Sequence, residues 1–532
     1  MSDLRQVLLS GIVIAASICM VACGSSGTSS NNGGAKFSGN TSVKVLLSST
    51  ANDQLSQFNL TLQSLTLTDQ AGNIASVLSG EWPAEFIHVN GAIEPLVTVT
   101  LPQGVYTSAT AVIGSANFTC LTVQPQDSPD APGSLTQSVF AYGYTPNANV
   151  TVNLPSPITI TGSSMGLVLN LQVAQSASYP STCYIDGIEP FAITPTFNLV
   201  AAGLAANPTN PTNGKVTQLE GTVAALGATG STLTLDLGEP FQPQRVFSVA
   251  SDSNTVYEGV SGFPALQVGT LLDLDGAVQS DGSILATRIA GYDPAALNEM
   301  IGPLLQLPAS VPDFYSFAIE QQGQTYSTQP QSLGIYTYAN GPSFQISDEL
   351  TNLGDLPFVA SFKSSNMVTG QNVAIFSQQI TDYYGGQYTP ATTITLMPQT
   401  INGSVVASTP AGNFTDYTVS LASYDLFPTL AIQPDAITVL NNPSFVEVYV
   451  DGSTQKLNTQ ALASGNTLRF YGLVFNDNGT LRMDCAQVSD GVTGSSTSGS
   501  GTNYLEAGRT TVQQRGSGTH PIRTMITRAH EN

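Results

Sequence analysis

The sequence has 532 residues, which is enough for three or four domains of ordinary size. Hydrophobic residues make up 41% of the chain and can form real cores, whereas charged residues make up only 9%. The formal net charge of −22 repels phosphate backbones and anionic lipid headgroups. We therefore expect no nucleic-acid partner, and the net charge alone does not predict a calcium protein.

The first residues have the features of an export signal. Arg5 precedes an apolar run over residues 7–18 that is too short to span a bilayer, and the sequence MVAC follows at 20–23. This pattern resembles bacterial lipoprotein signal peptides, in which the cysteine is lipidated and becomes the mature N-terminus. The resemblance implies a signal over residues 1–22 and a lipid anchor on Cys23. An ordinary secretory signal and an uncleaved membrane helix are the alternatives.

The same resemblance implies where the protein is located. The rest of the chain is then extracytoplasmic and lipid-anchored to the bacterial cell envelope. Gly24 follows Cys23, and by resemblance to enteric lipoproteins the lack of an aspartate there is compatible with the outer membrane. Residues 23–40 are rich in Gly, Ser and Asn without an apolar period, which predicts a flexible tether.

Residues 41–200 carry short alternating blocks that predict β-strands. In FNLTLQSLTLTD (58–69), leucines form the apolar face and Thr and Gln the polar one. Together with LPQGVYT (101–107) and ITITGSSMGLVLNLQVAQS (158–176), this block resembles an uncharacterised bacterial envelope-lipoprotein family. The resemblance implies a transthyretin-like or carbohydrate-binding-like sandwich and brings no assigned chemistry.

A Pro/Asn/Gly-rich linker at 201–214 separates this domain from a second pattern at 215–291. The second pattern has short alternating blocks with Gly269, Gly276 and DGSILA (281–286) at their ends. It resembles another uncharacterised family, of small OB-like β-barrel domains that are common in bacterial envelope proteins.

The barrel pattern recurs downstream. Over residues 399–490, the sequence INGSVV is similar to LEGTVA of the first copy. The spacing between Gly269 and Gly276 of the first copy also recurs between Gly465 and Gly472. A looser match around Gly370 predicts a degenerate copy over residues 292–398.

Two segments flank these copies. The sequence DPAAL (293–297) offers a cap, an early proline and helix formers, so it predicts one short helix. Residues 491–532 have few apolar residues and a mildly basic composition, which predicts a disordered, solvated tail.

Five cysteines are present, of which Cys19 and Cys23 belong to the signal. An extracytoplasmic compartment permits disulfides, and we hypothesise a bond between Cys120 and Cys183, which share one predicted domain. Cys485 is then left over and is expected to be a buried small hydrophobe near the end of a strand.

Two catalytic lookalikes favour structural interpretations. Ser164 lies in a G-x-S-x-G match at 162–166, but the text after it alternates like a strand, whereas a nucleophile elbow needs a helix there. We therefore expect a hairpin turn. His88 stands alone in FIHVN and is expected to be a histidine on a strand surface.

Two acidic patterns are weak evidence for a catalytic or cation-binding site. Asp273 and Asp275 share one face of a predicted strand and could do acid/base work or bind a cation, but the barrel pattern favours an exposed face. The sequence NDNG (476–479) lacks the spaced carboxylates of a calcium loop, so a turn is expected. We expect no metal, no cofactor and no catalytic residues.

Tyrosine is the aromatic residue with a plausible use in binding, because tyrosines grouped on a sheet can form a flat stacking platform for sugars. The alternative is an ordinary sheet surface. The residues of the possible platform are Tyr336, Tyr338, Tyr383, Tyr384 and Tyr388.

The sequence thus predicts an all-β lipoprotein with an N-terminal β-sandwich followed by two or three tandem OB-like β-barrels. Its expected function is non-catalytic binding of polysaccharide or another envelope component. The first alternative is a structural or assembly lipoprotein that bridges protein partners, and the second is a hydrolase with an unrecognised site.

Overall fold

The computed structural model of the chain divides into two compact units, Met1–Ser38 and Gly39–Asn532. The predicted signal, Cys23 and the helix expected at 293–297 lie outside the described residues. The described residues are 37–50, 55–89, 92–125, 135–143, 148–178, 192–202, 215–237, 245–291, 299–307, 314–322, 325–336, 342–347, 353–377, 381–383, 386–423, 425–431, 440–456, 460–491 and 510–513.

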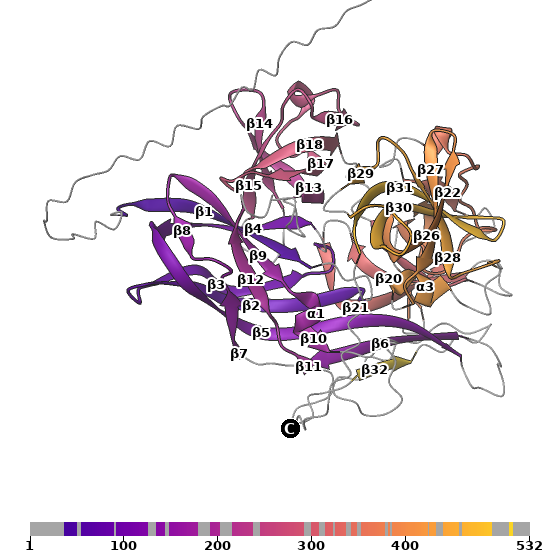
Figure 1. Cartoon of the computed structure of the whole chain (residues 1–532), viewed down its shortest axis with the longest axis horizontal. Coiled ribbons are helices and arrows are strands. Elements are labelled where there is room, and N and C mark those ends of the chain that lie inside the picture. The colour runs from indigo at the N-terminus through magenta and orange to yellow at the C-terminus, as the bar shows by residue number, and fades with distance from the viewer. Residues whose placement is uncertain are drawn as a thin grey trace, which may run out of the picture. The chain divides into compact units, whose positions relative to one another are not determined.

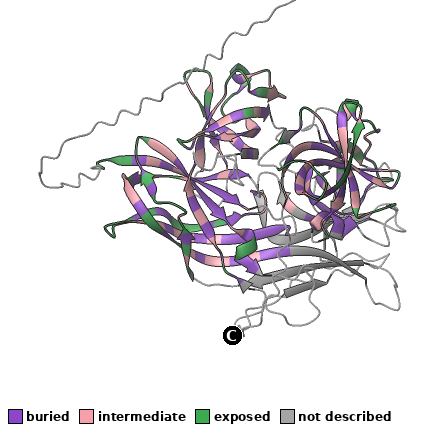
Figure 2. Ribbon diagram, in the orientation of Figure 1, coloured by how far each residue is buried: buried purple, intermediate pink, exposed green. Residues whose placement is uncertain are grey.

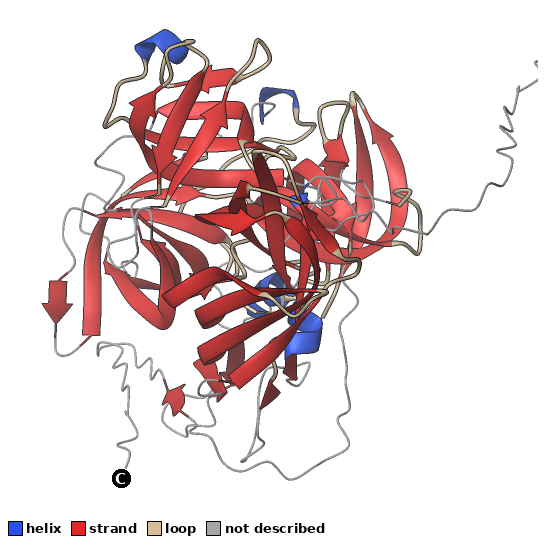
Figure 3. Ribbon diagram, turned by 90° about the vertical axis from the view of Figure 1, so that its left-hand side faces the viewer, coloured by secondary structure: helices blue, strands red, loops and turns tan. Residues whose placement is uncertain are grey.

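Strands dominate the second unit, and the predicted all-β fold class is confirmed (Figures 1 and 3). The described helical segments are short: α1 (Val173–Ser176), α3 (Leu426–Ala431), and the 3₁₀ turns η1 (Phe263–Ala265) and η3 (Leu353–Asp355).

The N-terminal domain is built on one sheet of eleven strands, whose main path is β3-β2-β5-β7-β12-β9-β1-β4. Although β3 and β4 end this path, they contact each other, so the sheet curls around a common core. The strands are β1 (Asn40–Ser49), β2 (Gln57–Asp69), β3 (Ile74–Glu85), β4 (Ile93–Pro102), β5 (Gly104–Pro125), β6 (Leu135–Gly143), β7 (Ala148–Asn153), β8 (Ile158–Ile160), β9 (Ser164–Leu171), β12 (Phe197–Ala201) and β32 (Thr510–Gln513), with β10 (Ala177–Ser178) and β11 (Ala192–Ile193) as a separate pair.

The predicted apolar face of β2 is the buried face. Leu60, Leu62, Leu65 and Leu67 are all at most 2% exposed, and the intervening threonines are only half-buried. Burial of each leucine contributes about 2 kcal/mol. Within the tail predicted to be disordered, the described segment β32 pairs antiparallel with β6, and the other residues after Gly491 lie outside the described residues, so disorder of the tail stays a prediction.

Three small barrels follow, and they share one topology. In each, strands 1, 2 and 3 form a meander, strand 4 pairs with strand 1, and strand 5 pairs with strand 4 and, in parallel, with strand 3. This closed order is that of an OB-like barrel. Strands 1 to 5 are β13 (Lys215–Leu226), β14 (Thr232–Asp236), β15 (Val246–Ala250), β17 (Leu271–Val278) and β18 (Ile284–Gly291) in barrel 1; β19 (Glu299–Gln306), β20 (Phe314–Gln322), β21 (Thr325–Tyr336), β23 (Asn372–Ser377) and β25 (Gly386–Leu396) in barrel 2; and β26 (Gln399–Ala411), β27 (Phe414–Leu421), β28 (Phe445–Val450), β30 (Thr467–Asp477) and β31 (Thr480–Asp490) in barrel 3.

Short extra strands pair with strand 5 of each barrel: β16 (Val256–Glu258) in barrel 1, β22 (Ser343–Ile346) and β24 (Thr381–Tyr383) in barrel 2, and β29 (Gln455–Lys456) in barrel 3.

The barrels also share a glycine turn before strand 4. Gly269, Gly370 and Gly465 have φ values of +89°, +84° and +90°. Each glycine N–H donates to a carbonyl of strand 1, on Val223, Leu304 or Val405 respectively, and the N–H of that strand residue bonds back to the residue after the glycine. The identical bonds make barrel 2 a structural copy of the other two, and the positive φ explains why glycine recurs.

The weak sequence similarity of barrel 2 to the other two barrels has a local cause. Strands 4 and 5 of each barrel change register, at Gly276 in barrel 1, Ser377 in barrel 2 and Gly472 in barrel 3. Serine in place of glycine at the second of these positions breaks the repeated spacing on which sequence comparison depends.

Buried residues alternate with exposed and half-buried ones along the barrel strands (Figure 2). Barrel 1 shares its core with the N-terminal domain, because Leu46, Ile93 and Val168 belong to the same buried cluster as the barrel residues. The turn between β17 and β18 makes a close contact there: the Gly166 N–H donates to Ser280, and the Ser164 hydroxyl donates to the Asp281 carbonyl at 2.9 Å.

Candidate functional site

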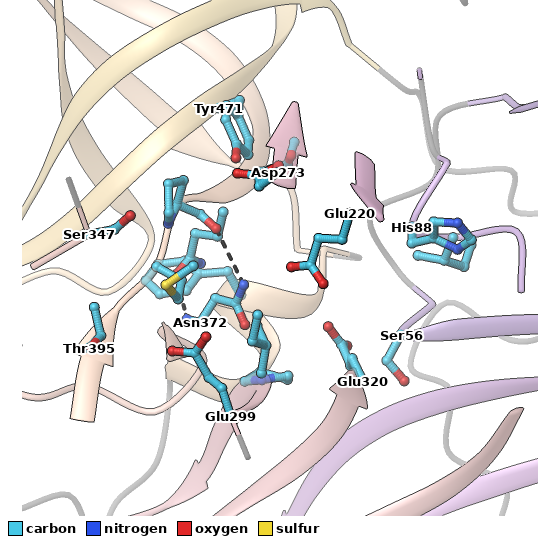
Figure 4. A pocket seen from close by; sticks show the side chains of 18 of the residues that line it. Ser56, His88, Glu220, Asp273, Glu299, Glu320, Ser347, Asn372, Thr395 and Tyr471 are labelled. Carbon is cyan, nitrogen blue, oxygen red and sulfur yellow. Dashed lines mark hydrogen bonds between the residues drawn. The ribbon is translucent and has the colours of Figure 1, made fainter. Parts of the chain in front are cut away.

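A cavity of about 900 Å³ is the main candidate site within the described residues, and it is large enough for a small ligand. Its wall includes the end of β3 and the turn after it, strands of barrel 1, much of barrel 2, and the starts of β26 and β30. Figure 4 shows polar side chains from these elements pointing into one space. We call it the acidic pocket.

The charge of the acidic pocket is strongly unbalanced. Two guanidinium groups line it, those of Arg288 and Arg469, together with the imidazole of His88. The carboxylates that line it are six: Glu85, Glu220, Glu258, Asp273, Glu299 and Glu320. Such a wall attracts cations and hydrogen-bond donors and repels phosphate or sulfate.

Glu320, on β20, is half-buried and lines this wall. In Figure 4 its carboxylate and that of Glu220 enter the same part of the cavity from opposite sides. Burial raises the pKa of Glu320 to about 8, and the negative charge of Glu85 acts in the same direction. Glu320 is therefore mostly protonated at neutral pH, unless a positive charge enters the pocket.

The barrel 1 side of the pocket holds an ion cluster around Arg288. Its Nε lies 2.7 Å from Glu258 Oε2, and one terminal nitrogen lies 2.8 Å from Asp273 Oδ2. Asp275 is 3.8 Å away. Burial raises the pKa of Asp273, and the nearby Arg288 opposes this rise. The positive charge of Arg288 is thus already engaged by carboxylates of its own barrel.

Two buried oxygens that line the pocket, Asp273 Oδ1 and Asn372 Oδ1, accept no hydrogen bond within the described part of the chain. Asn372 is held from the other side, because its backbone N–H donates to Gln399 Oε1 at 2.8 Å and its side-chain amide donates to Pro398. Buried acceptors without donors favour a ligand rich in N–H or O–H groups.

His88 is not on a strand surface, and that expectation was wrong. It lies in the turn after β3 with 14% of its side chain exposed, and its ring contacts Glu85 at 3.0 Å and Glu94. Burial lowers the pKa of His88, but the charges of Glu94 and Glu85 outweigh this and raise it to about 9. Glu94 also binds Arg245 of barrel 1, so the cluster ties the barrel to the N-terminal domain.

The expected exposed face at Asp273 and Asp275 was also wrong for the first of them, because Asp273 is only 8% exposed and ion-paired. Ser164 is no nucleophile elbow: it begins β9, and no helix follows it directly. It is not in a hairpin either, since β8 pairs with β5 while β9 pairs with β1 and β12.

The turn predicted at 476–479 is confirmed. Asn478 and Gly479 have φ values of +52° and +92° between the paired strands β30 and β31, as a tight hairpin turn requires. Cys485 is buried in β31 as a free thiol, and burial raises its pKa. Cys183 lies outside the described residues, so the bond from Cys120 stays a hypothesis.

Three of the predicted platform tyrosines lie on neighbouring strands of barrel 2: Tyr336 on β21, Tyr383 on β24 and Tyr388 on β25. Both β21 and β24 pair with the part of β25 that carries Tyr388. Tyr338 and Tyr384 lie outside the described residues. The stacking platform stays a prediction.

Sequence reasoning missed the acidic pocket, because its carboxylates come one or two at a time from strands far apart in the chain. Among the described residues, no three His, Cys, Asp or Glu side chains are grouped to hold a metal ion. No described helix is long and apolar enough to cross a bilayer.

Comparisons with known proteins add little chemistry. A family model described as "Domain of unknown function (DUF5666)" matches residues 220–290, which lie in barrel 1. No curated protein matches the chain. A solved structure titled "drosophila Unr CSD456" is 12% identical, with 52% of this chain and 98% of that chain covered at a TM-score of 0.12. A likeness at that TM-score carries no argument about this protein.

Proposed function

We propose that the protein is a non-catalytic binding protein of the bacterial cell envelope, and that the acidic pocket takes a segment of polysaccharide. The observation that carries this proposal is the wall of hydrogen-bond acceptors around a cavity of about 900 Å³. Sugar hydroxyls are donors that carboxylate and amide oxygens accept. Apolar groups such as Ile301, Met397 and Phe427 also line the cavity and can pack against the faces of sugar rings.

The proposal includes a lipid anchor on Cys23, which rests on the resemblance of residues 1–23 to lipoprotein signal peptides. A tethered protein with a pocket for glycans would hold polysaccharide close to the membrane. Labelling of cells with a fatty-acid analogue should mark the wild type and leave Cys23→Ser unmarked, whereas equal labelling would contradict the anchor.

Binding is tested with the full-length protein on an array of oligosaccharides, with and without calcium, while the same samples are analysed for released sugars. We expect saturable binding without product. A lack of binding to every oligosaccharide on the array would contradict the proposal. Release of sugars would indicate that the protein is an enzyme and would also contradict it.

A matched pair of variants locates the site. Thr395 lines the pocket on β25, while Thr392 on the same strand is exposed and outside the lining. Thr395→Trp fills the cavity and should weaken binding by about tenfold or more, or at least 1.4 kcal/mol. Thr392→Trp should leave it unchanged. Equal affinities for the two variants would place the ligand elsewhere.

A further inference from the structure

The inference here deepens the proposed function and rests on it: it concerns which polysaccharide the acidic pocket takes. The starting point is charge. Neutral sugars need no net charge in their site, but this wall places six carboxylates against three basic groups, Arg288, Arg469 and His88. Arg288 already binds Glu258 and Asp273, and His88 binds Glu85 and Glu94.

Glu320 is the carboxyl group whose surroundings most clearly favour binding of a cation. Within the described residues it makes no hydrogen bond or ion pair, and its electrostatic neighbour is another carboxylate, Glu85. Across the cavity Glu220 faces it (Figure 4). Glu299 also lines the same cavity. The positive groups of the wall, Arg288, Arg469 and His88, stand on other elements, and His88 is bound between Glu85 and Glu94.

A second, independent feature points to a donor ligand. Asp273, more than nine-tenths buried, has one carboxylate oxygen that accepts no hydrogen bond, and it lines the same cavity as Glu320. An ammonium group carries three donors and a positive charge, so it can satisfy such an oxygen and neutralise a carboxylate at once.

The arrangement does not match a metal site. A hard cation needs several oxygen ligands that converge on one point, and the His, Cys, Asp and Glu side chains of the described ranges form no such group of three or more. Carboxylates distributed along a cavity wall instead match positive charges distributed along a polymer.

We infer that the acidic pocket recognises a polysaccharide with free amino groups, whose ammonium groups are bound by Glu320, Asp273 and the neighbouring carboxylates. Binding is then coupled to proton release. Glu320 holds a proton in the empty pocket near neutral pH, because burial and Glu85 raise its pKa to about 8, and an incoming ammonium group displaces that proton.

The test compares three oligosaccharides of equal length and linkage by calorimetry on the full-length protein: β-1,4-linked hexamers of glucosamine, N-acetylglucosamine and glucose. We expect the glucosamine hexamer to bind about tenfold or more tighter than either neutral hexamer, and to weaken as salt rises. Equal binding of all three would overturn this inference and keep the proposed function. If none of the three binds while another glycan on the array does, the inference alone also fails.

Spermine, a polyamine without sugar rings, separates charge from sugar. We expect it to bind more weakly than the glucosamine hexamer at equal salt. Equal or tighter spermine binding would overturn the assignment to an amino polysaccharide and indicate a general polycation site.

Proton release gives a readout that a merely structural role of Glu320 would not move. Calorimetry at pH 5.5, where the amino groups of the ligand are already protonated, in buffers of different ionisation enthalpy should show about one proton released per glucosamine hexamer bound by the wild type. Glu320→Gln should release none and bind that hexamer at least about fivefold more weakly, with unchanged affinity for any neutral glycan that binds. Unchanged proton release in Glu320→Gln would overturn the role of this residue.

The control is Glu81→Gln, a charge change at an exposed position on β3 outside the pocket. It should match the wild type in affinity and in proton release. An equal loss in both variants would mean that net charge, and not the pocket, drives binding, which would overturn the inference.

Discussion

Barrels 1 and 3 have the same strand order and the same glycine turn, but they differ in the contacts that they make with the rest of the protein. In both, a threonine after strand 3 bridges to strand 5: Thr255 donates to the Ala286 carbonyl and Thr454 to the Cys485 carbonyl, each at 2.8 Å. Both threonines also accept an N–H from an aspartate three residues earlier. Hydrogen bonds that recur at equivalent positions in both barrels stabilise the shared barrel fold.

The two barrels differ at the turn between strands 4 and 5. In barrel 1, Gly282 packs so closely on the N-terminal domain that an added Cβ would lie 2.7 Å from Lys44 Cβ and 3.1 Å from the Gly166 Cα. In barrel 3, Asn478 at the corresponding turn is exposed. The contacts that do not recur therefore distinguish barrel 1, which packs on the N-terminal domain and contributes Asp273 and Arg288 to the acidic pocket.

The largest expected effect breaks the docking of barrel 1. Arg245 has 9% of its side chain exposed and binds Glu94, so Arg245→Met removes one of the two positive partners of this buried carboxylate, His88 being the other, and should cost about 3 kcal/mol in unfolding free energy. Arg482→Met in barrel 3 removes a more exposed ion pair and should cost about 1 kcal/mol. Urea denaturation measures both, and equal costs would contradict the docking role.

The same cluster predicts a pH dependence of stability above neutral pH. Because the folded pKa of His88 is about 9 and the ordinary value is 6.5, its stabilisation is fully present below pH 6.5 and is lost as the pH rises through 9. The loss is on the order of 3 kcal/mol. His88→Gln should flatten this part of the stability profile, and an unchanged profile would show that the histidine is not charged in the fold.

A glycine pair sharpens the comparison at the turns. Gly282 and Gly162 both have positive φ, +78° and +77°, but nothing lies within 4 Å of an added Cβ at Gly162. Gly162→Ala should cost about 1 kcal/mol from backbone strain, and Gly282→Ala about 2 kcal/mol more from the clash. Thermal or urea unfolding gives both values, and similar costs would mean that the contact is loose.

The smallest effect tests what the barrels share. Thr255→Val and Thr454→Val each remove a hydroxyl that donates to a buried carbonyl and accepts an aspartate N–H, in equivalent places, and should each cost about 1 kcal/mol. Hydrogen exchange at Ala286 and Cys485 should report similar local losses. Clearly unequal losses would argue that the two barrels are not equivalent structures.

Local patterns explain how much of this fold could be predicted. The alternation of leucines in β2 and the equal spacing of Gly269–Gly276 and Gly465–Gly472 depend on residues close in the chain, so they predicted a strand and two barrels. Ser377 weakened the same signal in barrel 2 without changing its topology.

The site could not be predicted in the same way. Glu85, three residues before His88, is a local hint that His88 pairs with a carboxylate, but Arg245 reaches Glu94 from 151 residues away. Glu85 likewise acts on the pKa of Glu320 only because barrel 2 packs against the N-terminal domain. Sequence spacing does not encode such contacts, whereas it does encode turns and strand faces.

The central claim is that polysaccharide binds in the acidic pocket. Hydrogen–deuterium exchange of the full-length protein, with and without a saturating oligosaccharide found on the array, tests it most directly. We predict slower exchange at 299–307, 314–322 and 395–400, which include the pocket-lining residues Glu299, Glu320 and Thr395, and no change in the exposed β26–β27 turn. Protection confined to 381–390, where the predicted tyrosine platform lies, would contradict the account.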